Sequence, residues 1–560
     1  MIPYRDFELV FPPLYTYINV VIVLIFGEHL IVFRAIGVLL FVGLAVLIYY
    51  IFKLISPSWI AAVAATVTIF VLQSEVASVA YDYIRFYDLF NYLAFFLILR
   101  PIMRSYKREP VNINLNLFLA GIFCALAVLM RQSSGVIVFI YFTIFLVLIS
   151  LIGRTSRKNL YCFFIGSSVP TAITIVWLVL VGAFTPFIEM TLLSESKGSI
   201  TSMFFNWIPR MFNENFIVSI LIIVIPVSFA ILLTRKKIDA RPANNVFDFL
   251  FYFIFIALVA VSIVALFFSL SLSSRIPGHL YHMLSPMFIL SFVLGIIILF
   301  KIIHQIRKKE HISYIEAAYL FFCGFIFAVG FGSGTSGALS LGQGALNFGF
   351  IVAIILDKIE RVPKAKLKAC LKTPTMALIL FLFIATPVSD KVITPYSWWG
   401  LTAENYSDAN FETHISYFKY IKMTADEKYV YENFVEKASL YLGDDDELYC
   451  YSQITIFYAL ANKVPTVKAP VAWFDVSRDK TILEDLEYLT QNNPKMIIFA
   501  DHGEWVLRSH EELFNDGNEL GHRKMYEWLI DLRDDTESNY TTIEVYRVHN
   551  YHIYLMLRDG

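Results

Sequence analysis

Long apolar runs, separated by short polar and basic segments, repeat along the first 390 residues of the chain. A helix needs roughly 17–25 apolar residues to cross the hydrocarbon core of a bilayer. By this criterion the pattern predicts about 12 membrane-crossing helices, some of them short. They cover 30–52, 57–77, 88–102, 113–130, 135–152, 160–184, 216–234, 247–271, 285–303, 314–331, 343–357 and 374–390. The run 13–27 is shorter, so we predict that it lies at the membrane interface or re-enters the membrane.

Residues 391–560 follow a different pattern, in which short apolar runs alternate with amphipathic segments. This alternation is typical of a soluble α/β domain. We predict strands over 448–451 and 496–500, helices over 477–490 and 520–533, and a terminal hairpin from 541–548 and 551–557. The pair Trp398–Trp399 is typical of an aromatic belt at a membrane interface.

Composition and charge also divide the chain. It is 58% hydrophobic and 16% aromatic, and its mean hydropathy is +0.63, far above that of a soluble protein. Residues 391–560 carry 16 Lys and Arg against 29 Asp and Glu, whereas residues 1–390 carry 29 against 17. We therefore predict a polytopic α-helical membrane domain at 1–390 and an acidic, soluble α/β domain at 391–560.

The basic residues orient the chain in the membrane. If each predicted span crosses once and Asp6 lies outside, the inner loops hold 22 of the 29 basic residues of the membrane domain. Cytoplasmic loops of membrane proteins carry such an excess of Lys and Arg. The same alternation places residues 391–560 on the side of Asp6. We thus predict a multi-pass plasma-membrane protein whose C-terminal domain is extracytoplasmic.

Ionisable groups gather on the predicted outer face. They are Arg5, Asp6 and Glu8; Asp82, Arg85 and Asp88; Arg131 and Gln132; and Arg275 with His279, Tyr281 and His282. Polar groups near membrane depth are costly and tend to line functional cavities. Because arginines bind phosphate oxygens in fork geometry, these clusters predict a site for an anionic, lipid-linked substrate. For Arg85 and Arg275 the alternative that the side chain only reaches toward lipid headgroups stays open.

Signatures of other site classes do not occur in the chain. It contains no GxxxxGK[ST], HExxH or GxSxG motif. Its five cysteines form no CxxC pair, so we predict neither a zinc site nor a disulfide framework. We expect no nucleic-acid partner.

Three segments near the amino terminus carry a family resemblance. They are Pro3-Tyr4-Arg5-Asp6-Phe7 with Pro12-Pro13-Leu14-Tyr15, Phe26-Gly27 and Arg34; Tyr83-Ile84-Arg85-Phe86-Tyr87-Asp88; and Leu129-Met130-Arg131-Gln132-Ser133. These segments resemble outer-loop motifs of the GT-C superfamily, which are polytopic glycosyltransferases that use polyprenyl-phosphate sugars. The third motif usually reads Leu-Thr-Lys-Gln in that superfamily. The layout of many spans followed by an external α/β domain is also similar.

The resemblance implies a glycosyltransferase in which an outer-loop carboxylate is the general base. Asp6 matches that position, with Arg5 and Glu8 beside it. The implied donor-phosphate ligands are Arg85, Arg131, Gln132 and Arg275, and the auxiliary candidates are Asp82, Asp88, His279, Tyr281 and His282. The implied partners are a polyprenyl-phosphate sugar, membrane lipid and a glycan, lipid or protein acceptor, as in cell-envelope polysaccharide synthesis. A divalent cation is left open as a cofactor.

The chain departs from the superfamily in one respect. There a transmembrane helix precedes the Pro-Tyr-x-Asp loop, so the resemblance implies that the native gene product has one more helix before Ile2. Two other functions stay open: a lipid or glycan transporter or flippase, and a polysaccharide polymerase or ligase. A transporter commonly shows internal repeats and midplane charges, and a polymerase or ligase would need a larger outer loop than 185–215.

Overall fold

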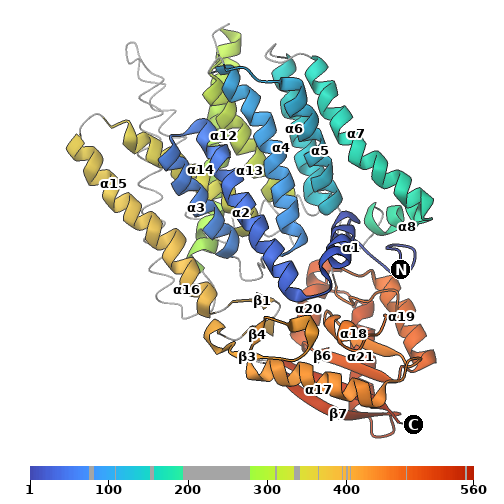
Figure 1. The fold of residues 1–560 in the computed structure, drawn as a ribbon. Helices are drawn as coiled ribbons and strands as arrows, with labels where there is room; N and C mark the ends of the chain where they lie inside the picture. The colour runs from blue at the N-terminus through green and yellow to red at the C-terminus, as the bar shows by residue number, and fades with distance from the viewer. Residues whose placement is uncertain are drawn as a thin grey trace. The chain divides into compact units, whose positions relative to one another are not determined.

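The computed structural model describes most of both predicted domains. The described residues are 1–74, 81–106, 109–151, 157–192, 278–308, 312–332, 341–362 and 365–559, apart from 394, 399–400, 404, 475 and 549–550. Within these ranges the chain is helical as far as residue 393 and mixes helices with strands after it (Figure 1). The predicted spans 216–234 and 247–271, Arg275 and the hairpin turn at 549–550 lie outside the described residues.

The apolar runs form helices close to their predicted bounds. The first series is α1 (Leu14–Phe26), α2 (Leu30–Ile55), α3 (Ser58–Ser74), α4 (Tyr83–Tyr106), α5 (Ile113–Met130), α6 (Gln132–Leu151), α7 (Arg157–Leu180), α8 (Phe184–Phe187) and the π-helix η1 (Ile188–Leu192). The second is α12 (Gly278–Arg307), α13 (Tyr314–Gly332), α14 (Leu341–Glu360), α15 (Ala365–Leu380), the π-helix η2 (Phe381–Ala385) and α16 (Thr386–Ile393). Eight helical segments in the described ranges are long and apolar enough to cross a membrane. The fold is thus that of a polytopic α-helical membrane protein, while the total of about 12 spans stays a prediction.

Packing divides the described residues into two compact units. Residues 1–36, 172–192 and 392–559 form the first unit, and residues 37–171 and 278–391 form the second. The boundary between the units falls inside α2, α7 and α16. This division follows the packing of residues and cuts through helices. The predicted domain boundary after residue 390 therefore stays a prediction.

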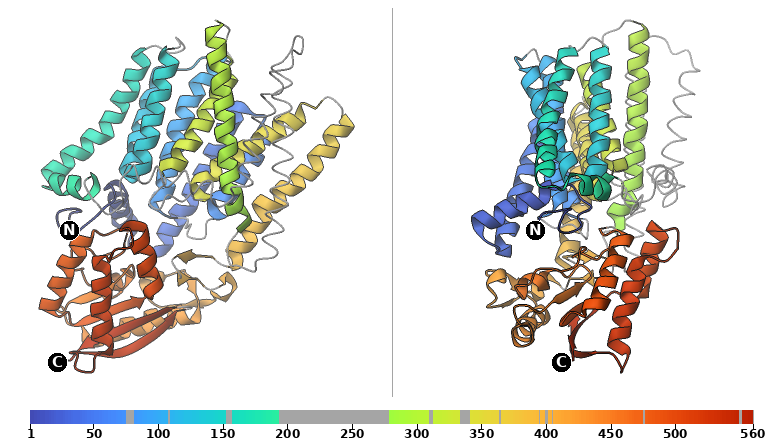
Figure 2. Two further views of the ribbon diagram at one scale, coloured as in Figure 1. Left: turned by 180° about the vertical axis from the view of Figure 1, so that it is seen from behind. Right: turned by 90° about the vertical axis from the view of Figure 1, so that its right-hand side faces the viewer.

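The second unit is a helical bundle whose helices run alongside one another (Figure 2). Its core is rich in phenylalanine: Phe95 of α4 stacks on Phe321 of α13 at 4.6 Å between ring centroids, and Phe145 of α6 lies 4.3 Å from the same ring. Small residues let α3 and α14 approach closely, since a Cβ on Gly349 would meet Thr68 Oγ1 at 2.0 Å. Such small-residue contacts are typical of helix packing in membranes.

The C-terminal part of the first unit is an α/β domain built on a four-stranded sheet. The strands are β5 (Leu448–Tyr451), β6 (Met496–Asp501), β7 (Tyr540–Val548) and β8 (Tyr551–Arg558), in the order β5-β6-β8-β7. β5 and β6 are parallel, and the other two pairings are antiparallel. The short strands β1 (Ser397–Trp398), β2 (Leu401–Thr402), β3 (Phe411–Glu412) and β4 (Lys422–Met423) form two hairpin-like pairs before it. The predicted strands and terminal hairpin are confirmed.

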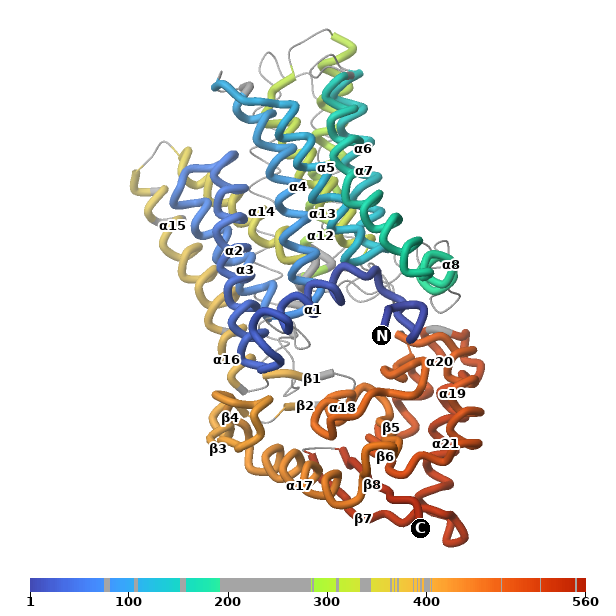
Figure 3. The backbone as a smooth tube through the Cα atoms, turned by 45° about the vertical axis from the view of Figure 1, so that its right-hand side comes forward, coloured from blue at the N-terminus to red at the C-terminus, as the bar shows by residue number. Residues whose placement is uncertain are grey.

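Helices cover both faces of this sheet (Figure 3). One face packs against α17 (Ala425–Tyr441) and α18 (Ile456–Leu460), and the other against α19 (Asp479–Asn492) and α21 (Gly521–Asp534), while α20 (Glu504–Phe514) follows β6. Alternate residues of each buried strand face opposite helices: Leu448 and Cys450 lie with α17, whereas Tyr449 and Tyr451 lie with α19. Because both faces are covered, β5 and residues 496–500 of β6 are apolar, which is why the sequence showed them as unbroken apolar runs.

Candidate functional site

The amino-terminal loop, residues 1–13, forms a tight turn in the first unit that exposes Arg5 and Asp6. The turn is closed by hydrogen bonds from Tyr4 N to Phe7 O and from Asp6 N to Ile2 O, each 2.9 Å. Tyr4 takes a left-handed backbone conformation, with φ of 69°. Its side chain is 2% exposed and packs edge-on against Phe187 with ring centroids 5.2 Å apart. The buried tyrosine therefore anchors the turn whose tip carries the two charged groups.

Arg5 and Asp6 form an ion pair on this turn. Arg5 Nε donates to Asp6 Oδ1 at 2.8 Å and Nη2 donates to Oδ2 at 3.2 Å. The backbone N–H of Ile2 donates to Asp6 Oδ2 at 2.6 Å. The side chains of Arg5 and Asp6 are 49% and 29% exposed. The carboxylate is thus oriented by three donors and still open to a ligand.

These contacts stabilise the charged form of Asp6. The hydrogen bond from Arg5, followed by the one from the Ile2 backbone, lowers the pKa of Asp6 from 3.8 to about 2. The side chain is therefore ionised at neutral pH, as the neighbouring Arg5 predicted. A carboxylate of such low pKa is a weak base and accepts a proton only from a strongly acidic donor.

Glu8 lies only two residues from Asp6 but in a different environment. Its side chain is 1% exposed, and Oε1 accepts hydrogen bonds from Arg478 N at 3.0 Å and Arg478 Nε at 2.9 Å. Its backbone N–H donates to Lys468 O at 2.6 Å. Arg478 is the N-cap residue of α19. Glu8 therefore joins the amino-terminal loop to the α/β domain at a point 470 residues away in the chain.

Asp485 of α19 binds the segment of the α/β domain that Glu8 contacts. It accepts hydrogen bonds at 2.8 Å from the backbone N–H groups of Lys468 and Ala469, the segment that also receives the Glu8 N–H. Burial, together with the nearby charge of Glu8, raises the pKa of Asp485 to about 6, although the two backbone donors oppose the shift. The loop thus sits against a small hydrogen-bonded network of the α/β domain.

The second unit brings Asp82, Arg85 and Asp88 together at the start of α4. Arg85 Nη1 donates to Asp88 Oδ2 at 3.0 Å, and their side chains are 4% and 3% exposed. Arg85 also lies over the ring of Phe41, 5.3 Å from its centroid, and donates to Leu72 O at 3.4 Å. Asp82 precedes the helix, where its backbone O accepts the Arg85 N–H at 3.0 Å. Arg85 is thus buried in the bundle, which differs from an arginine that reaches toward lipid headgroups.

Arg131 belongs to the same group of charges. It is the C-cap residue of α5, with an extended backbone (φ −149°, ψ 101°), and is 8% exposed. Its charge acts on both Asp82 and Asp88, so two acidic and two basic side chains lie in one region, where Asp82 is partly exposed and the other three are buried. Gln132 begins α6 directly after it. The predicted clusters at 82–88 and 131–132 are therefore one cluster in space.

Gly135 is the reason that α5 and α6 can meet so tightly beside Arg131. A Cβ at this position would lie 2.6 Å from Val128 Cα and 2.8 Å from Val128 N, both backbone atoms. Ser134 donates a short hydrogen bond to Gly332 O of α13. The segment 131–135 is thus held between three helices, and any larger residue at 135 would displace it.

The remaining candidate residues lie at or before the start of α12. His279, Tyr281 and His282 lie in the first turns of α12, and Arg275 precedes the described part of that helix. Within the described ranges, no group of three or more His, Cys, Asp and Glu side chains could hold a metal ion. The oxygens of Asp6 and Glu8 that are named above already accept hydrogen bonds within the protein.

The sequence did not point to Arg478 or Asp485, which hold the loop in place. Both lie in a domain that pattern alone predicts as soluble, and neither belongs to a catalytic motif. A buried aromatic and histidine cluster was also not foreseen. In it Phe474 stacks on His510 at 4.1 Å and on His522 at 4.8 Å, and Trp473 meets His502 at 5.4 Å, measured between ring centroids. The spacing of these residues along the chain carries no local signal.

No protein-family model matches the chain, and no curated protein matches it. Several solved structures are similar to the chain. The oligosaccharyltransferase AglB from Archaeoglobus fulgidus, in complex with an inhibitory peptide and a dolichol-phosphate, is similar over 99% of this chain and 67% of its own, with a TM-score of 0.46 and 12% identity. The zinc and sulfate complex of the oligosaccharyltransferase from the same organism is similar over 99% of this chain and 65% of its own, with a TM-score of 0.44 and 14% identity.

ArnT from Cupriavidus metallidurans, bound to undecaprenyl phosphate, is similar over 98% of this chain and 88% of its own, with a TM-score of 0.36 and 10% identity. The chain thus spans about two thirds of the length of the archaeal proteins and most of the length of ArnT. Because every TM-score quoted is below 0.5, the proposal of function rests on the residues of this chain.

Proposed function

We propose that this protein is a membrane glycosyltransferase that moves a sugar from a polyprenyl-phosphate donor to an acceptor on the extracytoplasmic face. The observation that carries the proposal is the exposed Asp6 carboxylate, oriented by Arg5 and Ile2 on an anchored turn. The low pKa of Asp6 keeps it ionised at neutral pH. The match of this turn to the GT-C outer loop supports the same assignment.

In the proposed reaction an acceptor hydroxyl attacks the anomeric carbon of the sugar. The bond between that carbon and the phosphate oxygen breaks, and the polyprenyl phosphate departs with the bonding electrons. The attacking oxygen becomes strongly acidic as its bond to carbon forms. Asp6 then accepts the proton late in the step, which suits a base of low pKa. Because the phosphate is a good leaving group, no separate acid is needed.

We assign different roles to the other candidates. Glu8 is a positioning residue, since its buried carboxylate is bound to Arg478. Arg85 is paired with Asp88 inside the bundle, so it organises the charge cluster. Arg131, in the extended segment between α5 and α6, is the proposed ligand of the donor phosphate, because arginine binds phosphate oxygens with paired N–H groups.

Replacement of Asp6 by Asn tests the base. Asn preserves the shape but cannot accept the proton, so kcat should fall by about 10²–10⁴-fold while the donor still binds. The matched control is Asp408→Asn, which changes an exposed aspartate of the first unit and should leave transfer unchanged. Sugar transfer by purified Asp6→Asn protein at the wild-type rate would refute the assignment.

Replacement of Arg131 by Ala tests the phosphate ligand separately. Loss of a charge-assisted hydrogen bond should lower kcat/KM for the donor by about 10- to 150-fold. Arg34 is the control because it is an exposed arginine on α2. Equal losses for Arg131→Ala and Arg34→Ala would remove Arg131 from the proposed site.

A further inference from the structure

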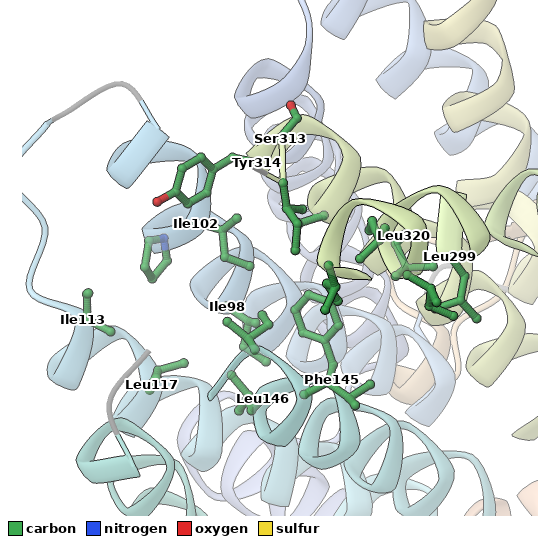
Figure 4. A pocket seen from close by; sticks show the side chains of 18 residues that line it. Ile98, Ile102, Ile113, Leu117, Phe145, Leu146, Leu299, Ser313, Tyr314 and Leu320 are labelled. Atoms are coloured by element: carbon green, nitrogen blue, oxygen red, sulfur yellow. The ribbon is translucent and has the colours of Figure 1, made fainter. Parts of the chain in front are cut away.

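An apolar cavity of about 310 Å³ lies among α4, α5, α6, α12 and α13 in the second unit (Figure 4). Its lining includes Ile98, Leu117, Phe145, Ile302 and Leu320, and its only hydroxyl-bearing residues are Ser313 and Tyr314. The volume falls at the lower end of the range typical of ligand pockets, about 300–1,000 Å³. It can therefore take part of a hydrocarbon chain and offers nothing to a charged group.

The cavity lies at one end of the bundle. The lining residues come from the last turns of α4, α6 and α12 and from the first turns of α5 and α13. Along α4, Ile102 is 17 residues beyond Arg85, which corresponds to about 25 Å of helix. The cavity is thus separate from the buried charge cluster at the start of α4.

Basic side chains follow the lining residues at this same end. Arg307 and Lys308 are exposed and come directly after Ile306, the last lining residue of α12. Arg104, two residues after Ile102, is partly exposed and lies 3.4 Å from Glu109. This end carries the loops that the positive-inside rule assigns to the cytoplasm. An apolar cavity with a basic rim matches a lipid that has an anionic headgroup.

We propose that this cavity binds an acyl chain of an anionic phospholipid of the cytoplasmic leaflet, with Arg307 and Lys308 contacting the lipid phosphate. The hydrocarbon fills the apolar space between the helices, and the headgroup stays at the interface beside the basic residues. The bound lipid fills the space that α12 shares with α4 and α6. This site is independent of glycosyl transfer, because its ligand is a lipid that takes no part in the reaction.

Lipid binding to the purified full chain tests the proposal. Thermal unfolding in detergent is measured with added phosphatidylglycerol and with phosphatidylcholine of the same acyl chains. We expect phosphatidylglycerol to raise the unfolding temperature more. The double change Arg307→Gln and Lys308→Gln should weaken the apparent affinity for phosphatidylglycerol by about 30-fold, because each basic residue contributes to binding an anionic surface. Lys53→Gln changes an exposed basic residue of α2 and should leave the affinity for phosphatidylglycerol unchanged.

A second variant tests the cavity itself. Ala317 is part of the lining, and Ala317→Phe should fill the space and remove the response to both lipids. Native mass spectrometry provides a second readout that does not depend on this variant: the wild-type protein should retain an anionic phospholipid that the double variant loses. Equal responses of the wild type to both lipids would overturn the proposal. Displacement of the bound phospholipid by polyprenyl phosphate would also overturn it, by assigning the cavity to the donor's tail.

Discussion

Glu8 accepts, on a single carboxylate oxygen, both the backbone N–H and the guanidinium Nε of Arg478, at 3.0 and 2.9 Å. The acidic side chain is 1% exposed and the basic one 25% exposed. Because Glu8 lies two residues from Asp6, this contact fixes the turn that presents the proposed base. Asp6 is accessible and Glu8 is buried, so two carboxylates of one loop lie in different environments.

Removal of Arg478 should destabilise the first unit. Arg478→Met leaves the buried Glu8 charge without its guanidinium partner, which should cost about 3–5 kcal/mol of unfolding free energy. The double variant Glu8→Gln with Arg478→Met should lose less unfolding free energy than Arg478→Met alone, because the buried charge of Glu8 has been removed as well. Lys480→Met, at an exposed position of α19, serves as the control. Additive effects of the two single changes, measured by thermal unfolding, would contradict a coupled pair.

Arg5 should determine the pH below which the protein loses activity. Its hydrogen bond is the largest cause of the low Asp6 pKa, so Arg5→Ala should raise that pKa from about 2 toward the ordinary 3.8. Since the ionised carboxylate is the proposed base, activity is lost as the pH falls through this pKa. The variant should therefore lose kcat/KM between about pH 5 and 4, where the wild-type protein does not. Superimposable pH profiles of wild-type and variant protein would argue against Asp6 as the base.

The buried histidines should make the α/β domain sensitive to acid. Burial lowers the pKa of His502 to about 4 and that of His522 to about 3, from 6.5. Between pH 6.5 and those values the unfolded chain binds more protons, so stability falls as the pH decreases. Each histidine contributes at most about 1.4 kcal/mol per pH unit, and about half of that near pH 6.5, where the unfolded side chain is half protonated. As the pH falls through about 6, the raised pKa of Asp485 acts in the opposite direction and cancels part of the loss.

The measurement is thermal unfolding of the full chain at pH values between 7.5 and 5.5. His522→Phe keeps an aromatic ring against Phe474 but cannot bind a proton, so it should show less than half of the wild-type loss of stability between pH 6.5 and 6, because Asp485 offsets the same amount in both proteins. A stability that is flat over this interval in the wild-type protein would show that the two histidines titrate normally.

Gly135→Ala should disturb the segment that carries Arg131. The new Cβ would meet backbone atoms of Val128 at 2.6 and 2.8 Å, and backbone cannot move aside as a flexible side chain can. We expect a loss of stability of about 1–3 kcal/mol and a weaker donor interaction. Gly43→Ala is the control, because nothing lies within 4 Å of its Cβ. Equal unfolding temperatures of the two variants would contradict the close approach of α5 and α6.

The apolar pattern by itself determined most of the helices and the central strands. α5 spans Ile113–Met130, the predicted 113–130, because a bilayer requires one long uninterrupted apolar helix for each crossing. β5 and β6 were visible because both faces of these strands are covered, which leaves no polar position before Asp501 at the end of β6. Helix α17 was missed although its capping box, Thr424 with Glu427, is a local signal, since its exposed face makes the segment polar overall.

Only the tertiary structure decided the environment of each candidate side chain. Arg5, Asp6 and Glu8 read alike in the sequence, yet the first two are exposed and Glu8 is buried against Arg478. The joining of Arg131 with Asp82 and Asp88 was likewise not predictable from spacing. Local patterns report which residues face lipid, water or core, because these depend on the period of a helix or strand. Partners distant in the chain are chosen by packing, and therefore carry no periodic signal.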